Sequence, residues 1–289
     1  MKNSLFLISA FLFLFSPMAT AQEEMGGVVA PDEGAAVATG EVSPLVKELS
    51  EKVAKAFLGN KWQGKMNFTM TDEMGGDTNL KVAAKFQDMS HFAFDITMMM
   101  EDPFEGEVEQ TFNLMSDGEW LYLNSPDIAQ LSGGMANGPI KVNIKLVMQM
   151  MGAESEGMPS SEELVPMLSA VMSEMLGAAE AEGMSLEEKD STEELRRYEA
   201  SMEAGGEKAS MVACFCSKSF MPMSIEMTQG DGESSAFKME TTEMKMVEEF
   251  SADTFVFTVP EGVVVTDLTP MLQMSMQGAM APAEEDLEF

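Results

Sequence analysis

The chain has 289 residues, and its 17 Lys and Arg stand against 49 Asp and Glu, which gives a formal charge of −32. A nucleic-acid-binding protein needs a basic face for the phosphate backbone, so composition argues against this class. Apolar residues make up 45% of the chain and include 32 Met and 18 Phe. A disordered acidic chain is poorer in both, and we therefore expect a folded domain with an apolar core.

The first 21 residues have the pattern of a cleaved signal peptide. Lys2 is followed by an almost purely apolar run over 5–15, which is too short to span a bilayer. Small residues at 19–21 fit cleavage after Ala21, and no nearby Cys could accept a lipid. No second apolar run approaches the roughly 20 residues that a membrane helix needs. We expect an exported, periplasmic protein, with residues 22–42 as a flexible leader.

An amphipathic helix is expected over 43–58. Ser43 suits the N-cap and Pro44 the first helical position, and apolar residues then recur every four residues until Gly59 and Asn60 end the pattern.

A second helix is expected over about 160–177, where a capping-box sequence at 160–163 precedes an apolar stripe. Residues 140–151 fit either a strand or a helix. Residues 178–188 are interpreted as an acidic connector.

Elsewhere the apolar period is two, which is typical of strands with one apolar face. The expected strands cover 62–70, 80–86, 92–100, 108–114, 120–123, 211–216, 223–227, 237–239, 244–246 and 255–259. Turns are expected at 75–77 and 116–118, since their Gly residues accept the positive φ of tight hairpins. The short connections favour an antiparallel meander.

Two segments resemble the periplasmic lipoprotein-carrier family, LolA-like. Residues 115–122, followed by Pro126, are similar to the family's Ser-Asp-Gly turn, aromatic strand and Pro. Residues 255–263, with Asp267, are similar to its closing strand, in which two Phe precede Pro, Gly and Val. The family's basic residues before the third strand, linked to lid closure and ligand release, have no counterpart in residues 86–92. Arg196 and Arg197, the only arginines, stand in the connector region.

The resemblance implies an α+β fold in which a strongly curved antiparallel β-sheet, a half-barrel, encloses the helices over an apolar cavity. The carrier-like domain covers residues 43–270, and 271–289 form a Met-rich acidic tail. The implied function is non-enzymatic: a carrier that binds lipid or lipoprotein acyl chains and delivers them toward the outer membrane. Inner-membrane donor and outer-membrane acceptor proteins are further candidate partners, and the chain is expected to be a monomer. A regulator that senses lipoproteins with the same fold is an alternative.

Met is flexible and polarizable, so a wall rich in Met adapts to ligands of varied shape. Burial of an acyl chain contributes about 0.8 kcal/mol per CH₂, or roughly 10 kcal/mol for about 14 carbons. The same residues would equally fill an ordinary core, and this alternative stays open. The residues expected to line an acyl cavity are Trp62, Met66, Phe68, Met70, Phe92, Phe94, Ile96, Met98, Phe112, Leu114, Leu168 and Met172.

Copper is the other interpretation of the Met content, because thioethers select Cu(I). The candidate clusters are the Met residues within 271–280, within 221–223 and within 98–100. Cys214 and Cys216 fall on one face of a strand, where a bond between them would be strained. We interpret them as small buried apolar residues, with a metal or redox pair as the alternative.

Catalytic chemistry has little support in the sequence. His91 is the only His, and a nucleophile elbow, a P-loop and a dinucleotide fingerprint are all missing from the 289 residues. We therefore expect no enzyme, and no catalytic residue, cofactor or metal ligand is assigned.

Overall fold

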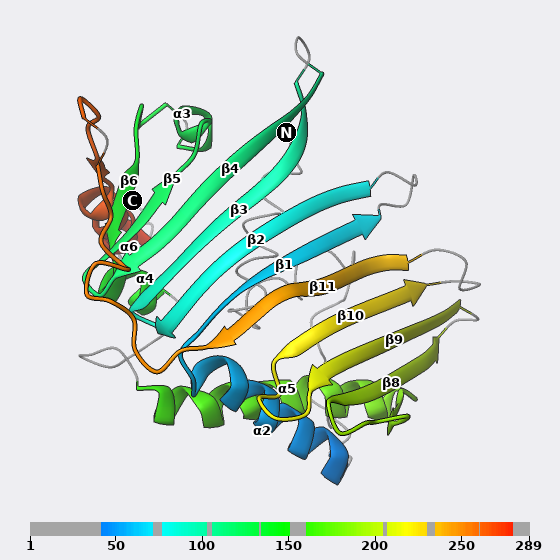
Figure 1. Cartoon of the computed structure of the whole chain (residues 1–289). Helices are drawn as coiled ribbons and strands as arrows, with labels where there is room; N and C mark the ends of the chain where they lie inside the picture. The colour runs from blue at the N-terminus through cyan, green and yellow to red at the C-terminus, as the bar shows by residue number, and fades with distance from the viewer. Residues whose placement is uncertain are drawn as a thin grey trace, which may run out of the picture.

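The computed structural model describes residues 42–71, 77–102, 106–132, 134–150, 160–204, 207–229, 235–259 and 261–279. The expected signal peptide, the leader up to residue 41, the glycines of the turn at 75–77 and tail residues 280–289 lie outside the described residues. The helices are α2 (Pro44–Leu58), α3 (Ile128–Leu131), α4 (Ile144–Met150), α5 (Ser161–Ala181) and α6 (Thr269–Ala279) (Figure 1). The strands are β1 (Trp62–Thr71), β2 (Asp77–Asp88), β3 (His91–Asp102), β4 (Gly106–Asp117), β5 (Trp120–Asn124), β6 (Ile140–Asn143), β7 (Ser185–Glu188), β8 (Leu195–Ala204), β9 (Glu207–Cys216), β10 (Pro222–Gln229), β11 (Ser235–Met246) and β12 (Thr266–Asp267).

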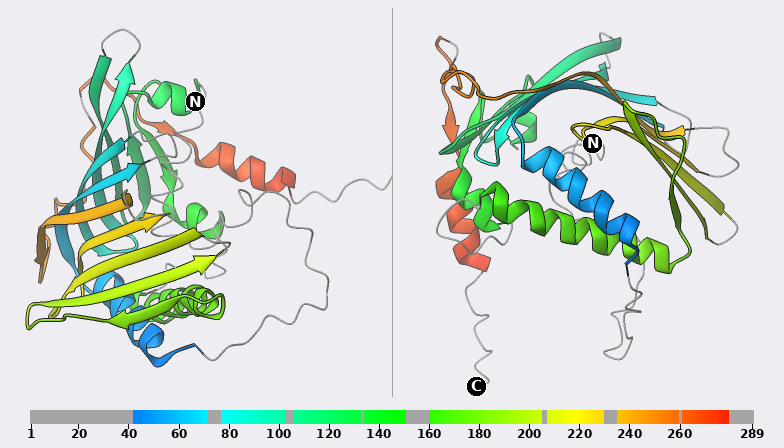
Figure 2. Two further views of the ribbon diagram at one scale, coloured as in Figure 1. Left: turned by 90° about the vertical axis from the view of Figure 1, so that its right-hand side faces the viewer. Right: turned by 60° about the horizontal axis from the view of Figure 1, so that its bottom comes forward.

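All twelve strands belong to one sheet, in the order β12-β6-β5-β4-β3-β2-β1-β11-β10-β9-β8-β7. Two antiparallel meanders, β1 to β6 and β7 to β11, join where β1 pairs with β11. The sheet is strongly curved, and α2 and α5 lie on its concave side (Figure 2). The expected α+β fold with a curved sheet is confirmed. The sheet is mixed rather than purely antiparallel, because β12 runs parallel to β6.

Helix α2 begins and ends as its sequence predicts. The Ser43 hydroxyl accepts a hydrogen bond from the Val46 backbone N–H, and Pro44 occupies the first turn. At the other end, the side-chain amide of Asn60 donates to the Lys55 carbonyl oxygen. The helix packs on β1, where Nε1 of Trp62 donates to the Phe57 carbonyl oxygen at 3.0 Å. These contacts fix α2 over one end of the concave face.

Helix α5 crosses the open side of the curved sheet and lies along α2 (Figure 2). Its capping box is confirmed, since Glu163 accepts hydrogen bonds from the backbone N–H and hydroxyl of Ser160. It extends to Ala181, four residues beyond the expected end at 177. Near its C-terminus, Glu180 accepts hydrogen bonds from the backbone and hydroxyl of Ser43, which links α5 to the start of α2.

One expectation about α5 was too strict. Among the described residues it is the one helix long and apolar enough, by length and composition alone, to cross a membrane. From the sequence, no second apolar run of membrane-spanning length was expected. Here α5 lies against the domain, with Leu164, Leu168 and Met172 packed on the core.

Two expectations about the middle of the chain were incomplete. Residues 140–151, which fit both types, split into β6 and α4. The acidic connector contains β7, and the following segment is β8, which carries both arginines. Arg196 pairs with Glu188 at 2.9 Å and Arg197 with Glu199 at 2.8 Å.

The expected closing strand over 255–259 is not a strand. Its aromatic residues are held by ring contacts instead of the backbone hydrogen bonds of a strand. Phe255 is buried and lies edge-on to Phe250. Phe257 stacks on Tyr122 with ring centroids 4.6 Å apart. The expected tail also begins inside α6, whose residues 271–279 are helical.

Candidate functional site

The strand residues expected at the site lie on one face of the sheet, in rows that cross β1 to β4. Met66 is opposite Val82, Val82 is opposite Ile96, and Ile96 is opposite Phe112. Because side chains alternate between the two faces of a strand, all members of these rows point to the same side. That side carries α2 and α5 and is the concave face (Figure 2). The ten sheet residues brought together are Trp62, Met66, Phe68, Met70, Phe92, Phe94, Ile96, Met98, Phe112 and Leu114.

These ten side chains are unequally covered. Trp62 is 1% exposed and stacks on Phe86 beneath α2, with ring centroids 5.8 Å apart. The buried members are Trp62, Met66, Phe94 and Met98. The half-buried members are Phe68, Met70, Phe92, Ile96, Phe112 and Leu114. Buried and half-buried residues occur within the same rows, so the wall is only partly covered.

The two expected site residues on α5 lie one helical turn apart and face the domain. Leu168 and Met172 are half-buried and pack against the core cluster. On the same helix, Met167 is 62% and Met175 50% exposed. Helix α5 therefore turns one apolar side toward the sheet and another toward solvent.

Part of this wall lies on the second meander and was not predicted from the sequence. The Phe68 row continues through Met239 of β11, Ile225 of β10 and Ala213 of β9 to Tyr198 of β8. Tyr198 is buried and packs edge-on to Phe215 at 5.9 Å. An alternating signal was present in β8, where residues 198, 200 and 202 are apolar, but no strand was predicted there.

Two hollows lie elsewhere, and the twelve expected site residues line neither of them. One of about 480 Å³ is lined by Gln63, Gly64, Lys65, Ala83, Lys85, Glu243, Met244 and Lys245. The other, of about 240 Å³, is lined by Cys216, Ser219, Met223, Thr241, Thr242, Glu243, Met244 and Met246.

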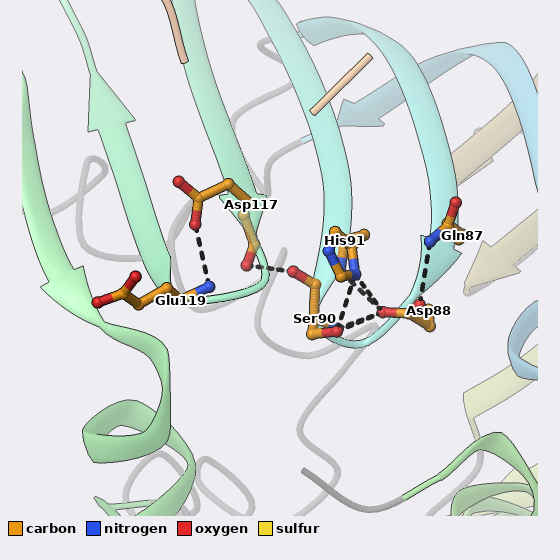
Figure 3. Close-up of polar contacts among 7 residues, drawn as sticks. Gln87, Asp88, Ser90, His91, Asp117 and Glu119 are labelled. Carbon is orange, nitrogen blue, oxygen red and sulfur yellow. Dashed lines mark hydrogen bonds and ion pairs between the residues drawn. The ribbon is translucent and has the colours of Figure 1, made fainter. Parts of the chain in front are cut away.

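A polar cluster surrounds His91 in the turn between β2 and β3 (Figure 3). Nδ1 of His91 lies 3.0 Å from the Ser90 hydroxyl and 3.1 Å from the Asp88 carboxylate. In a hydrolase triad the Ser and the Asp contact opposite nitrogens of the ring, so this cluster lacks the geometry of proton relay. The Asp88 carboxylate also accepts hydrogen bonds from the backbone N–H groups of Ser90 and His91, which closes the turn.

The opposite ring nitrogen of His91 faces Gly118, in the hairpin between β4 and β5. A Cβ on Gly118 would lie 2.7 Å from Nε2, and the φ of +97° is unfavourable for other residues. The expected turn at 116–118 is confirmed: the Asp117 carboxylate accepts hydrogen bonds from the backbone N–H groups of Glu119 and Trp120. The cluster and this hairpin brace one end of the sheet.

Burial raises the pKa of the Asp88 carboxyl, but hydrogen bonds from Ser90 and His91 outweigh it and leave the pKa lowered. The pKa values of the Tyr122 and Tyr198 phenols are raised to about 12. Burial is the main cause, and nearby carboxylates add to it. These shifts follow from packing and turn formation.

Cys214 and Cys216 are free thiols and are half-buried, so the expectation of buried residues was wrong. The hydroxyl of Ser219 hydrogen-bonds the Cys216 sulfur, which lowers the thiol pKa against the effect of burial. Among the described residues, three or more His, Cys, Asp and Glu side chains nowhere gather as a metal site would require.

No protein-family model and no curated protein sequence matches the chain. Solved structures are similar at low identity. An uncharacterized conserved protein from Thermus thermophilus has 10% identity and a TM-score of 0.38, over 76% of this chain and 98% of that one. A structure of the MucA/MucB complex of Pseudomonas aeruginosa has 10% identity and a TM-score of 0.40, over 76% of this chain and 63% of that one. A LolA superfamily protein from Nitrosomonas europaea has 9% identity and a TM-score of 0.29, over 73% and 97%. These values assign the chain to no family.

Proposed function

We propose that this protein binds the acyl chains of lipids or lipoproteins between the concave face of its sheet and α5, and carries them through the periplasm toward the outer membrane. The observation that carries the proposal is the apolar wall across β1 to β4, of which six expected residues are only half-buried. Half-buried apolar side chains on a concave face are places where a guest hydrocarbon can replace solvent.

The helix over this wall supports the same role. None of the 21 residues of α5 is buried, although Leu168 and Met172 face the core. A small displacement of α5 therefore breaks few buried contacts. Each CH₂ of an acyl chain that enters would contribute about 0.8 kcal/mol, which favours a long, unbranched guest.

The chemistry of the wall also suits a variable guest. It combines rigid Phe rings with Met side chains, whose unbranched thioethers adapt their shape. The opposite face of the same strands is polar, with Lys81, Asp95 and Glu109 exposed to solvent. A high negative charge keeps a protein with apolar binding surface soluble.

Phe112→Glu tests the site, with Thr111→Glu as its matched control. Phe112 is half-buried on the concave face, whereas Thr111 is exposed on the other face of the same strand. We expect Phe112→Glu to weaken binding of a fluorescent fatty acid at least tenfold, since a carboxylate would face the hydrocarbon; this corresponds to about 1.4 kcal/mol. Thr111→Glu should bind as the unchanged protein does.

Native mass spectrometry of the protein purified from the periplasm gives an independent readout. We expect a co-purified lipid that is lost in Phe112→Glu and kept in Thr111→Glu. If the unchanged protein carries no lipid and takes up no acyl probe, the wall is an ordinary core and the proposal is wrong. The mass of the exported chain checks cleavage after Ala21, and lipid transfer to outer-membrane vesicles checks delivery.

A further inference from the structure

Four sulfur-containing side chains line the hollow of about 240 Å³, and they come from three separate strands. Cys216 comes from the end of β9, Met223 from the start of β10, and Met244 and Met246 from the end of β11. The hollow lies beyond the end of the β10–β11 ladder, whose last pair joins Ser224 and Glu240.

The contacts of these side chains show how the fold presents them. Cys216 lines the hollow together with Ser219, which lies in the turn that follows β9. The Met244 sulfur lies 3.1 Å from the place where a Cβ on Gly64 would stand, so the missing side chain leaves room for the thioether. Met246 is 38% exposed, which leaves a path from solvent.

The other lining groups compete little with sulfur as ligands. Glu243 contributes a carboxylate, but its oxygen is already paired with the Lys65 ammonium group at 2.8 Å. The remaining groups are the hydroxyls of Ser219, Thr241 and Thr242. Hard cations prefer several carboxylate and carbonyl oxygens, whereas thiolate and thioether sulfurs are soft ligands that suit Cu(I).

We propose that this hollow is a Cu(I) site, with the Cys216 thiolate and the thioethers of Met223, Met244 and Met246 as ligands. Cu(I) takes the place of the thiol proton, which passes to solvent, and no electron is transferred. The site is independent of the acyl-binding wall, because none of the twelve residues expected there lines it.

The clusters of Met that are adjacent in sequence are poorer candidates. Met98 is buried on the concave face while Met99 is 43% exposed on the opposite face. Met221 is completely buried and does not line the hollow, whereas its near neighbour Met223 does. On α6, Met274 is 66% exposed. In a strand, successive Met side chains point to opposite faces of the sheet, whereas the pairing of strands brings Met residues that are distant in sequence close together.

Anaerobic titration of the full mature chain with Cu(I), against a chromogenic Cu(I) chelator, tests the site. We expect one tightly bound ion per chain. Mutation of outer-shell partners commonly costs roughly 10–100-fold in metal affinity, so loss of the thiolate in Cys216→Ser should cost at least about 100-fold. Met246→Leu, a change of similar volume on a partly exposed side chain, should cost at least about tenfold.

Cys214→Ser and Met99→Leu are the matched controls and should leave the affinity unchanged. X-ray absorption of the loaded protein should show sulfur as the sole ligand type. Circular dichroism checks that each variant is folded. Unchanged affinity in both Cys216→Ser and Met246→Leu, or a first shell of oxygen or nitrogen, would overturn the assignment. So would loss of binding on replacement of Met271 and Met274 by Leu, which would place the ion on α6.

Discussion

Helices α2 and α5 lie side by side on the concave face, yet the domain uses them differently. Seven of the 15 residues of α2 are buried, and its Val46 is completely inaccessible. None of the 21 residues of α5 is buried, and the helix contains Pro166 in its second turn. One helix is part of the core, and the other is a cover over it.

The difference shows that an apolar stripe does not by itself decide how deeply a helix is buried. Both helices carry a stripe and a capped N-terminus. Helix α2 lies directly on Trp62, whereas α5 packs along α2 and contacts the core through half-buried side chains such as Leu168 and Met172. A cover of this kind suits a protein that must admit a guest.

The largest expected difference between matched variants of the two helices comes from a Leu→Ala substitution in each of them. Leu49→Ala in α2 should lower the free energy of unfolding by about 2–5 kcal/mol, because it leaves a cavity in a closed core. Leu168→Ala in α5 should lower it by less than about 1.5 kcal/mol, because the side chain is only half-buried. Urea denaturation with unchanged slopes measures both values. Equal losses would show that α5 belongs to the core.

Ser43→Ala should have the next largest effect, since the Ser43 hydroxyl serves both helices. It caps α2 and donates to Glu180 of α5 at 2.7 Å. We expect a loss of about 1 kcal/mol, as for other N-caps, together with faster proteolysis within α5. Ser160→Ala, whose hydroxyl bonds to Glu163 of its own helix, is the control and should leave hydrogen exchange in α2 unchanged. Unaltered proteolysis of α5 in Ser43→Ala would show that the link does not hold the cover.

The solvent side of α5 should tolerate charge. Replacement of Met167 and Met175 together by Lys should change the free energy of unfolding by less than about 0.5 kcal/mol, as is usual at exposed positions. Val46→Lys in α2 should instead prevent folding, because it buries an unpaired ammonium group. Thermal unfolding compares the two. A loss beyond about 1 kcal/mol in the double variant would mean that the outer side of α5 is packed.

The smallest effect is a pH dependence confined to α5. Hydrogen bonds from the backbone and hydroxyl of Ser160 lower the pKa of Glu163 below its ordinary value of 4.5. The ionised Glu163 therefore stabilises the start of α5 fully when the pH is above the ordinary pKa. This stabilisation is lost as the pH falls through the lowered pKa of the folded protein. Hydrogen exchange at the start of α5 should speed up on acidification, and Glu163→Gln should remove this component. The α2 cap is a hydroxyl that does not titrate there, so the start of α2 should show no matching change.

The local patterns predicted the faces of the elements well. The four-residue spacing after Ser43 gave α2 almost to the residue, and the alternation gave β1 to β5 and the shared face of their apolar residues. The Asp-Gly turn at 117–118 was also found. These features follow from backbone period and turn chemistry, which neighbouring residues encode.

The predictions from the sequence failed where contacts with distant segments determine the structure. Residues 255–257 alternate like a strand, but the two Phe rings dock on His91, Phe250 and Tyr122 without a ladder. β8 alternates too, yet its identity rests on pairing with β7 and β9. The four sulfurs at the hollow come from three strands, so no spacing in the sequence predicts their meeting.

The sequence by itself determined which residues share a face, because strand and helix periods are properties of a few neighbouring peptide units. Only the tertiary structure decided which of those faces are buried, half-buried or exposed. Burial depends on what lies opposite, and here the opposing groups come from α2, α5 and a second meander more than 100 residues away. For that reason Trp62 and Phe68, six residues apart on one strand face, differ in exposure.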